Sequence, residues 1–124
     1  MLNTTKIADS GEIKIHSWNV NGLRAAAKKG FLDWLERDGG DVVCLQEVRA
    51  RPEQLRDDLR TPLGWKTEIV AGEKLGYSGV SVFSRLAWDQ TSSSLGEAQF
   101  DREGRVQILQ FGSLKIANVY FPNG

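Results

Sequence analysis

The stretches Ser17-Trp18-Asn19-Val20-Asn21-Gly22-Leu23-Arg24 and Val42-Val43-Cys44-Leu45-Gln46-Glu47 decide the fold of this 124-residue chain. In each, a segment with the pattern of a β-strand runs into a side chain that carries an oxygen able to bind a metal ion. That side chain is Asn19 in the first stretch and Glu47 in the second. The two stretches therefore predict two strands, each with a polar group at its end.

The sequence around these stretches predicts the order strand, helix, strand. In Ile13-Lys14-Ile15-His16-Ser17-Trp18, apolar and polar residues alternate with the period of two expected of a strand. Phe31, Trp34 and Leu35 follow at helical spacing, and Gly39-Gly40 supplies a C-terminal stop. Val42-Val43-Cys44-Leu45 is a continuous apolar run, which is typical of a strand buried on both faces.

A second helix and four further strands are predicted downstream. Pro52 is expected to open the helix, Leu55 and Leu59 to form its inner face, and Thr61-Pro62 to end it. The rest of the chain is rich in strand-forming residues, with Ser92-Ser93-Ser94 among the predicted separators. The expected strands are Trp65 to Val70, Gly79 to Ser84, Arg105 to Phe111 and Leu114 to Tyr120.

Composition predicts one globular domain, residues 12–124, after a loose tail, residues 1–11. No apolar run approaches the roughly 18 residues of a membrane span, and the tail lacks the apolar core of a signal peptide, so no membrane contact is expected. The single Cys44 suits a reducing compartment, which predicts a cytoplasmic location. Zero net charge argues against general polyanion binding, so contact with nucleic acid would need a local basic patch. Candidates for that patch are Arg24, Lys28, Lys29, Arg49 and Arg51.

If the first two strands lie parallel, Asn19 and Glu47 both emerge at the carboxyl edge of the sheet, where open α/β sheets bind ligands. An amide carbonyl and a carboxylate are hard oxygen ligands that suit Mg²⁺, which keeps several waters and needs few protein ligands. The alternative is that Asn19 and Asn21-Gly22 only turn the chain and Glu47 is a solvated charge.

Five ordered motifs extend the first two stretches into a family pattern. They are Trp18 to Arg24, Asp41 to Glu47, Tyr77-Ser78-Gly79-Val80, Asp101-Arg102-Glu103-Gly104-Arg105 and Tyr120-Phe121-Pro122-Asn123-Gly124. In this order they resemble the exonuclease III family of abasic-site endonucleases, over residues 13 to 124. The resemblance implies an α/β (α+β) fold. This chain would form one half of a four-layer α/β/β/α sandwich, with a mixed, mostly antiparallel sheet and two or so helices on one face.

The resemblance also implies roles for individual residues. Glu47 and Asn19 match the metal-binding positions for Mg²⁺, with Mn²⁺ as a possible substitute, and Tyr120 matches the catalytic tyrosine that contacts the scissile phosphate or the attacking water. A phenol suits that task because it donates a hydrogen bond while staying neutral. The DNA-binding positions implied are Arg24, Lys28, Tyr77, Gly79 and Asn123.

The implied function is a Mg²⁺-dependent DNA-repair phosphodiesterase that cleaves 5′ to abasic sites and has 3′-5′ exonuclease activity. Its substrate would be double-stranded DNA with abasic sites or 3′ ends, in a bacterial-like cytoplasm and associated with the nucleoid when on DNA. The family's later Asp-x-Asn and Asp-His pairs do not follow Gly124, so the isolated chain is expected to be inactive. The alternative is a non-catalytic or split-protein half that binds metal, DNA or a partner without cleavage. We expect either the missing C-terminal half of the fold or a second copy, as a homodimer, to cover the apolar inner face of its sheet.

Overall fold

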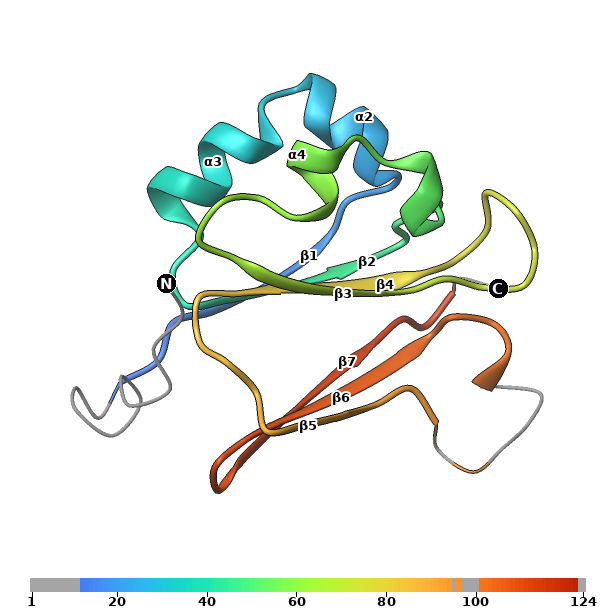
Figure 1. Cartoon of the computed structure of the whole chain (residues 1–124). Helices are drawn as coiled ribbons and strands as arrows, with labels where there is room; N and C mark the ends of the chain where they lie inside the picture. The colour runs from blue at the N-terminus through green and yellow to red at the C-terminus, as the bar shows by residue number, and fades with distance from the viewer. Residues whose placement is uncertain (1–11, 95, 97–100, 123–124) are drawn as a thin grey trace.

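Helices, a four-stranded sheet and a three-stranded sheet form three successive layers in the computed structural model (Figure 1). The structure describes residues 12–94, 96 and 101–122. The predicted tail, residues 1–11, therefore lies outside the described residues, and so does Asn123. None of the described helices is long and apolar enough to cross a membrane.

The first sheet has the strand order β1-β2-β4-β3. Its strands are β1 (Ile15–Asn19), β2 (Val42–Gln46), β3 (Lys66–Val70) and β4 (Val80–Ser84). The pair β1 and β2 is parallel, whereas β4 is antiparallel to both of its neighbours. The predicted mixed, mostly antiparallel sheet is confirmed, and so are the parallel first two strands.

Four helices that the structure describes pack on one face of this sheet, as expected (Figure 1): α2 (Leu23–Lys28), α3 (Phe31–Asp38), the 3₁₀ helix η1 (Pro52–Gln54) and α4 (Asp57–Arg60). Phe31 of α3 meets Phe83 of β4 edge to face, with ring centroids 5.4 Å apart, and both side chains are fully buried. The sequence does not predict helix α2, because only Leu23 and Ala26 of its six residues are buried and so the apolar pattern is short.

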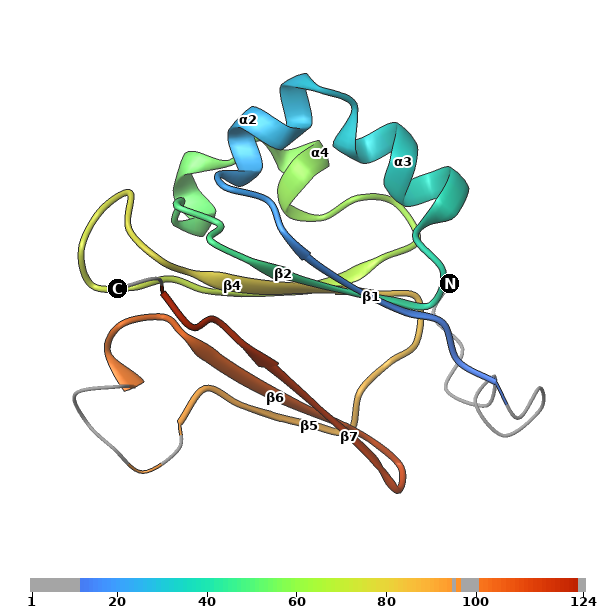
Figure 2. The same ribbon diagram turned by 180° about the vertical axis from the view of Figure 1, so that it is seen from behind.

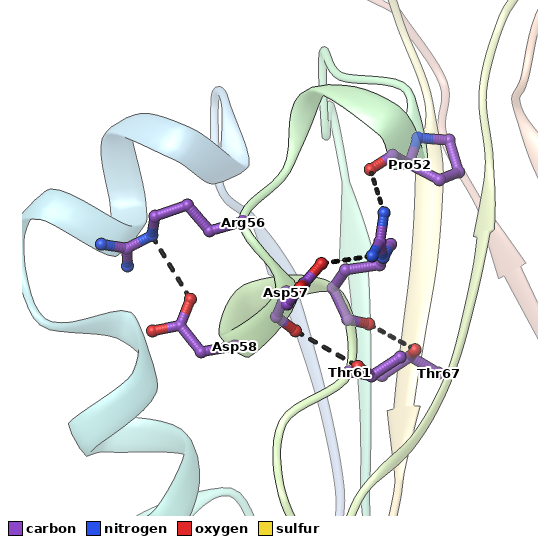
Figure 3. A network of polar contacts seen from close by, with 7 residues as sticks. Pro52, Arg56, Asp57, Asp58, Thr61 and Thr67 are labelled. Carbon is purple, nitrogen blue, oxygen red and sulfur yellow. Dashed lines mark hydrogen bonds and ion pairs between the residues drawn. The ribbon is translucent and has the colours of Figure 1, made fainter.

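The predicted single helix after Pro52 is wrong in extent, because the chain is extended at Leu55 and Arg56 between η1 and α4. Leu55 and Leu59 are nevertheless buried against the sheet as predicted. Side chains secure the short α4, as Figure 3 shows: Arg60 pairs with Asp57, and the Thr61 hydroxyl donates to the Asp57 carbonyl at 3.2 Å. The Thr67 hydroxyl of β3 donates to the Arg60 carbonyl at 2.6 Å, which attaches α4 to the sheet.

The second sheet, of order β5-β6-β7, is a separate layer that the sequence does not predict. It consists of β5 (Gln90–Ser92), β6 (Val106–Phe111) and β7 (Leu114–Val119). The sequence does not predict strand β5, because its three residues are all exposed and carry no apolar signal; its last residue, Ser92, belongs to the predicted separator Ser92-Ser93-Ser94. The antiparallel hairpin of β6 and β7 turns at Gly112-Ser113, as the sequence indicates.

The second sheet lies on the side of the first away from the helices (Figure 2). It covers the apolar inner face that was expected to need the C-terminal half of the fold or a second copy to cover it. Val42, Cys44, Val82 and Leu86 pack there against Leu109 and Phe111 of β6 in one buried cluster. The expectation that the chain supplies about one sheet is therefore wrong, and the reason given for a homodimer through that face is removed. The chain supplies parts of both sheets of a sandwich and the helices on one side of it.

Candidate active site

The carboxyl ends of β1 and β2 bring Asn19 and Glu47 together. The Asn19 Nδ2 atom donates a hydrogen bond to Glu47 Oε1 at 3.1 Å, across 28 positions of sequence. This contact exists because the two strands are parallel and in register, with Asn19 opposite Gln46. The predicted convergence of the two side chains at one sheet edge is confirmed.

Glu47 has three polar side chains around its carboxylate. Besides Asn19, the Arg49 Nη2 atom lies 2.6 Å from Glu47 Oε2, and Tyr120 lies near enough to lower the pKa of the same carboxylate. The pKa of Glu47 is lowered, first by the hydrogen bond from Asn19, against the opposing effect of burial, and further by Tyr120 and Arg49. Burial, and then the neighbouring Glu47, raise the pKa of Tyr120. At neutral pH the site therefore holds an ionised carboxylate beside a neutral phenol.

Four residues at the site have left-handed backbones although none is glycine. They are Asn21, Glu47, Arg49 and Ser78, with φ between 50° and 59°. Such backbones are uncommon and cost free energy, so they persist only where the surroundings hold them, which is often at functional sites. These are the only non-glycine residues with positive φ in the described part of the chain, and all four belong to the loops at this edge.

Backbone hydrogen bonds join the five family motifs in a row. The Gly22 amide donates to the Glu47 carbonyl at 2.7 Å, and the Arg49 amide donates to the Ser78 carbonyl at 2.8 Å. The row continues from the Gly79 amide to the Gly104 carbonyl at 3.0 Å, and the Tyr120 amide donates to the Arg105 carbonyl at 2.8 Å. Segments far apart in sequence thus form one continuous surface.

A family model described as "Endonuclease/Exonuclease/phosphatase family" matches residues 16–122, which is most of the chain. The chain belongs to this family.

Similar proteins within the endonuclease/exonuclease/phosphatase family include enzymes named for DNA cleavage. The chain is 32% identical over 122 residues to the "DNA-(apurinic or apyrimidinic site) endonuclease" of Dictyostelium discoideum, covering 98% of this chain and 33% of that protein. It is 39% identical over 112 residues to the "Exodeoxyribonuclease" of Bacillus subtilis (strain 168), covering 90% of this chain and 43% of that protein. The chain thus spans well under half the length of these relatives.

Solved structures of other proteins show the same fold. An AP endonuclease from Archaeoglobus fulgidus superposes with a TM-score of 0.76 at 22% identity, covering 90% of this chain and 42% of that one. A 3′-5′ exonuclease from Neisseria meningitidis superposes with a TM-score of 0.75 at 24% identity, covering 89% and 42%. The expected half-sandwich architecture is confirmed by these superpositions.

The predicted DNA-binding residues of this family member flank the Glu47 cluster on two sides. On one side Arg24 donates to the Arg49 carbonyl at 3.2 Å, and with Lys28 it lines a hollow of about 330 Å³ between α2 and α4. On the other side Tyr77 lies beside a second hollow, of about 470 Å³, and is 40% exposed. The backbone of Gly79 lies between them, with φ of 94°. A Cβ atom added at Gly79 would lie 3.4 Å from the Cβ atom of Val48.

Glu47 offers a carboxylate of the kind that suits a hydrated Mg²⁺ ion, and binding of that ion stays a prediction. Its ionised carboxylate is 16% exposed and so remains accessible from solvent. Asn19 turns its amide nitrogen toward Glu47, while its Oδ1 atom accepts a hydrogen bond from the Asn21 amide at 3.0 Å. In this orientation Asn19 holds the carboxylate in place, and its role as a metal ligand stays a prediction. Among the described residues, no three His, Cys, Asp or Glu side chains cluster closely enough to form a larger metal site.

Sequence reasoning misses the full role of Arg49 and overlooks two inward-facing polar residues, the half-buried Gln46 and the buried Asn118. The sequence marks Arg49 as a member of a basic patch and, through the resemblance, as a positive charge two residues after Glu47. It does not predict that Arg49 forms an ion pair with Glu47. Gln46 ends an otherwise apolar run, and Asn118 is a lone polar residue at an inward-facing position of β7. A polar residue at an inward position of a strand is the signal that marks both of them.

Proposed function

We propose that this chain forms part of a Mg²⁺-dependent DNA-repair phosphodiesterase that cleaves 5′ to abasic sites and removes nucleotides from 3′ ends. The observation that carries the proposal is the meeting of Glu47, Arg49 and Tyr120 at one edge of the sandwich. Relatives named as an abasic-site endonuclease and an exodeoxyribonuclease support DNA as the substrate. The substrate proposed is double-stranded DNA that contains an abasic site or a 3′ end.

Glu47 would hold the Mg²⁺ ion, and Mn²⁺ would replace it. When bound, the ion supplies positive charge against the developing charge on the phosphate. Asn19 and Arg49 keep the Glu47 carboxylate ionised and fixed in orientation, since both donate hydrogen bonds to it. A carboxylate held in this way needs little reorganisation when a cation arrives.

Tyr120 would orient the scissile phosphate. Its phenol stays protonated at neutral pH because its pKa is raised, so it donates a hydrogen bond to a phosphate oxygen without adding negative charge. Arg24 and Lys28 on one side and Tyr77 on the other would contact the flanking backbone phosphates. Contacts of this kind position a duplex without reading its sequence.

The isolated chain is proposed to bind DNA without cutting it, which is the second candidate function. Hydrolysis needs a group that activates water and another that protonates the leaving oxygen, besides a metal. Among the described residues, Glu47 belongs to no group of three or more His, Cys, Asp or Glu side chains that could hold a metal ion. The missing groups would come from the C-terminal half of the fold or, in a homodimer, from a second copy.

A nicking assay combined with a binding assay tests both candidates. A labelled duplex with one abasic site is incubated with the purified chain in Mg²⁺, Mn²⁺ or EDTA. Glu47→Gln removes the proposed metal ligand, and Glu36→Gln, an exposed acid on α3, is the matched control. All proteins are purified identically, so that contaminating host nuclease appears equally in each.

We expect no nicking above the Glu47→Gln background. We also expect duplex binding that strengthens with Mg²⁺ in the parent and in Glu36→Gln but not in Glu47→Gln. Nicking that requires both Mg²⁺ and Glu47 would show that this chain assembles a working site, and the proposed inactivity would be wrong. Absence of duplex binding in every condition would contradict the proposed DNA substrate.

A further inference from the structure

Glu47 and Tyr120 reach the candidate site from different sheets. Glu47 follows β2 of the first sheet, and Tyr120 follows β7 of the second. The two sheets are held together largely by apolar side chains, and the hydrophobic effect that drives such packing has no directional preference. Some directional contact between the sheets is therefore needed if the carboxylate and the phenol are to meet.

Asn118 provides that contact at the end of the sandwich where the site lies. Its side chain is 2% exposed, and its Oδ1 atom accepts a hydrogen bond from Gln46 Nε2 at 2.9 Å. Its Nδ2 atom donates to the carbonyls of Leu45 and Ser81 at 3.1 and 3.0 Å. One side chain of β7 is thus bonded to both central strands of the first sheet, β2 and β4.

The hydrogen bonds continue from this pair in both directions. Gln46 also donates to the Ser17 hydroxyl of β1 at 3.1 Å. Asn118 donates to Gln107 of β6 at 3.2 Å, and Gln107 donates to the Glu68 carbonyl of β3 at 3.0 Å. The Thr91 hydroxyl of β5 donates to the Glu68 carboxylate at 2.6 Å. The network therefore has a member on every strand of both sheets.

Two members of this network stand next to the site in sequence. Gln46 is bonded covalently to Glu47, and Asn118 lies two residues before Tyr120. We infer that Gln46 and Asn118 are positioning residues of the candidate site, because their inter-sheet hydrogen bond holds the Glu47 carboxylate and the Tyr120 hydroxyl together. The purpose of this positioning rests on the proposed function. The geometry itself can be tested without measuring any activity.

A purely structural role predicts something different. Polar groups that are buried without partners cost free energy. A fully bonded network such as this one therefore fixes the orientation of the two sheets more than it adds net stability. If it only stabilised the fold, any equally destabilising change between the sheets would affect the site equally. If it positions the site, loss of the Gln46 to Asn118 bond uncouples Glu47 from Tyr120 while other inter-sheet changes do not.

Fluorine NMR on the full chain separates the two roles. The protein is labelled with 3-fluorotyrosine, and Tyr77→Phe leaves Tyr120 as the single fluorinated residue, since the chain has two tyrosines. The measured quantity is the change in the Tyr120 signal caused by Glu47→Gln. It is compared in the parent, in Asn118→Ala and in Gln46→Met, which keeps the side-chain length but loses the donor. Leu109→Ala, a buried residue between the same two sheets outside the network, is the control.

We expect Glu47→Gln to shift the Tyr120 signal in the parent and in Leu109→Ala, and the shift to fall well below half in Asn118→Ala and Gln46→Met. An undiminished shift in the Asn118 and Gln46 variants overturns the inference, as does an equal loss in Leu109→Ala. If Asn118→Ala does not fold, Gln46→Met decides the question alone. Because no nuclease activity is measured, a negative nicking and binding result leaves this test intact.

Discussion

Gly104 is a left-handed position at which the structure leaves no room for a side chain, and Gly104→Ala should destabilise the protein more than its backbone angle alone explains. Gly104 has φ of 63°, and a Cβ there would lie 2.4 Å from the Gly72 nitrogen and 2.7 Å from the Ala71 carbonyl carbon. Gly112 is the matched control, because its φ is 59° and a Cβ there would meet nothing within 4 Å. Both substitutions place an alanine at a left-handed backbone position, and they differ in whether the added Cβ atom meets other atoms.

The magnitudes follow from these two situations. A non-glycine residue at a left-handed position costs about 1–2 kcal/mol, which is the whole loss expected for Gly112→Ala. At Gly104 the overlapping atoms are the backbone of Ala71 and Gly72. Their loop is tied to that of Gly104 by the hydrogen bond from the Glu73 amide to the Arg102 carbonyl, at 3.1 Å, so the two loops cannot separate without lengthening it. Overpacking of this kind adds about 1–3 kcal/mol, so Gly104→Ala should lose about 2–5 kcal/mol.

Urea unfolding followed by tryptophan fluorescence measures the difference. With a slope of about 1–3 kcal/mol per M, the midpoint of Gly104→Ala should fall below that of Gly112→Ala by roughly 1 M. Equal midpoints for the two variants would show that the loops at residues 71–73 and 101–105 do not approach as closely as described. The row of bonded loops at the site would then lose one of its links.

Three further predictions concern buried and ionisable groups. Ser81→Ala should stabilise the protein by about 1 kcal/mol, because the buried Ser81 hydroxyl has no hydrogen-bond partner among the described residues. Ser84→Ala should cost about 1 kcal/mol, because the Ser84 hydroxyl accepts a hydrogen bond from the Leu86 amide at 3.0 Å, and urea midpoints of the opposite order would contradict both expectations. The Cys44 thiol, whose pKa burial raises to about 11, should not react with a disulfide reagent at about pH 8 until urea unfolds the chain, and rapid reaction of the native protein would contradict its burial. Because the pKa of Glu47 is lowered on folding, its ionisation contributes stability above its ordinary value of 4.5 that is lost as the pH falls through the folded pKa. Glu47→Gln lacks this contribution, so the difference in unfolding free energy between parent and variant should narrow between about pH 6 and about pH 3, and a constant difference would contradict the lowered pKa.

The parts of the fold that could be predicted are those whose signal is local. The alternation before Asn19 and the apolar run before Glu47 predict β1 and β2, and the helix between them predicts their parallel pairing. Parallel pairing is enough to bring both side chains to one edge of the sheet. The site prediction succeeds there because it needs only strand direction.

The assignment of strands to sheets could not be predicted from the same signals. A period of two indicates that β6 is a strand, but it does not tell which sheet the strand joins, because that depends on partners far away in sequence. Gln107 and Asn118 add to the difficulty, since polar residues in a strand normally indicate a solvent-facing side, and these two face inward. Their hydrogen bonds to other strands are what permit it, and such partners are visible only in three dimensions.

The row of loop-to-loop hydrogen bonds also has a consequence for how the protein opens. Because its members come from residues 22 to 120, no single supersecondary unit contains the site, and opening of either end of the chain breaks a link in it. The amide hydrogens of Gly22, Arg49, Gly79 and Tyr120 should therefore exchange with solvent as one cooperative group. Their common free energy of opening would be that of the least stable hydrogen bond in the row. The site would then report the first opening of either end of the chain, and would be lost before the buried core around Phe31 and Phe83 unfolds.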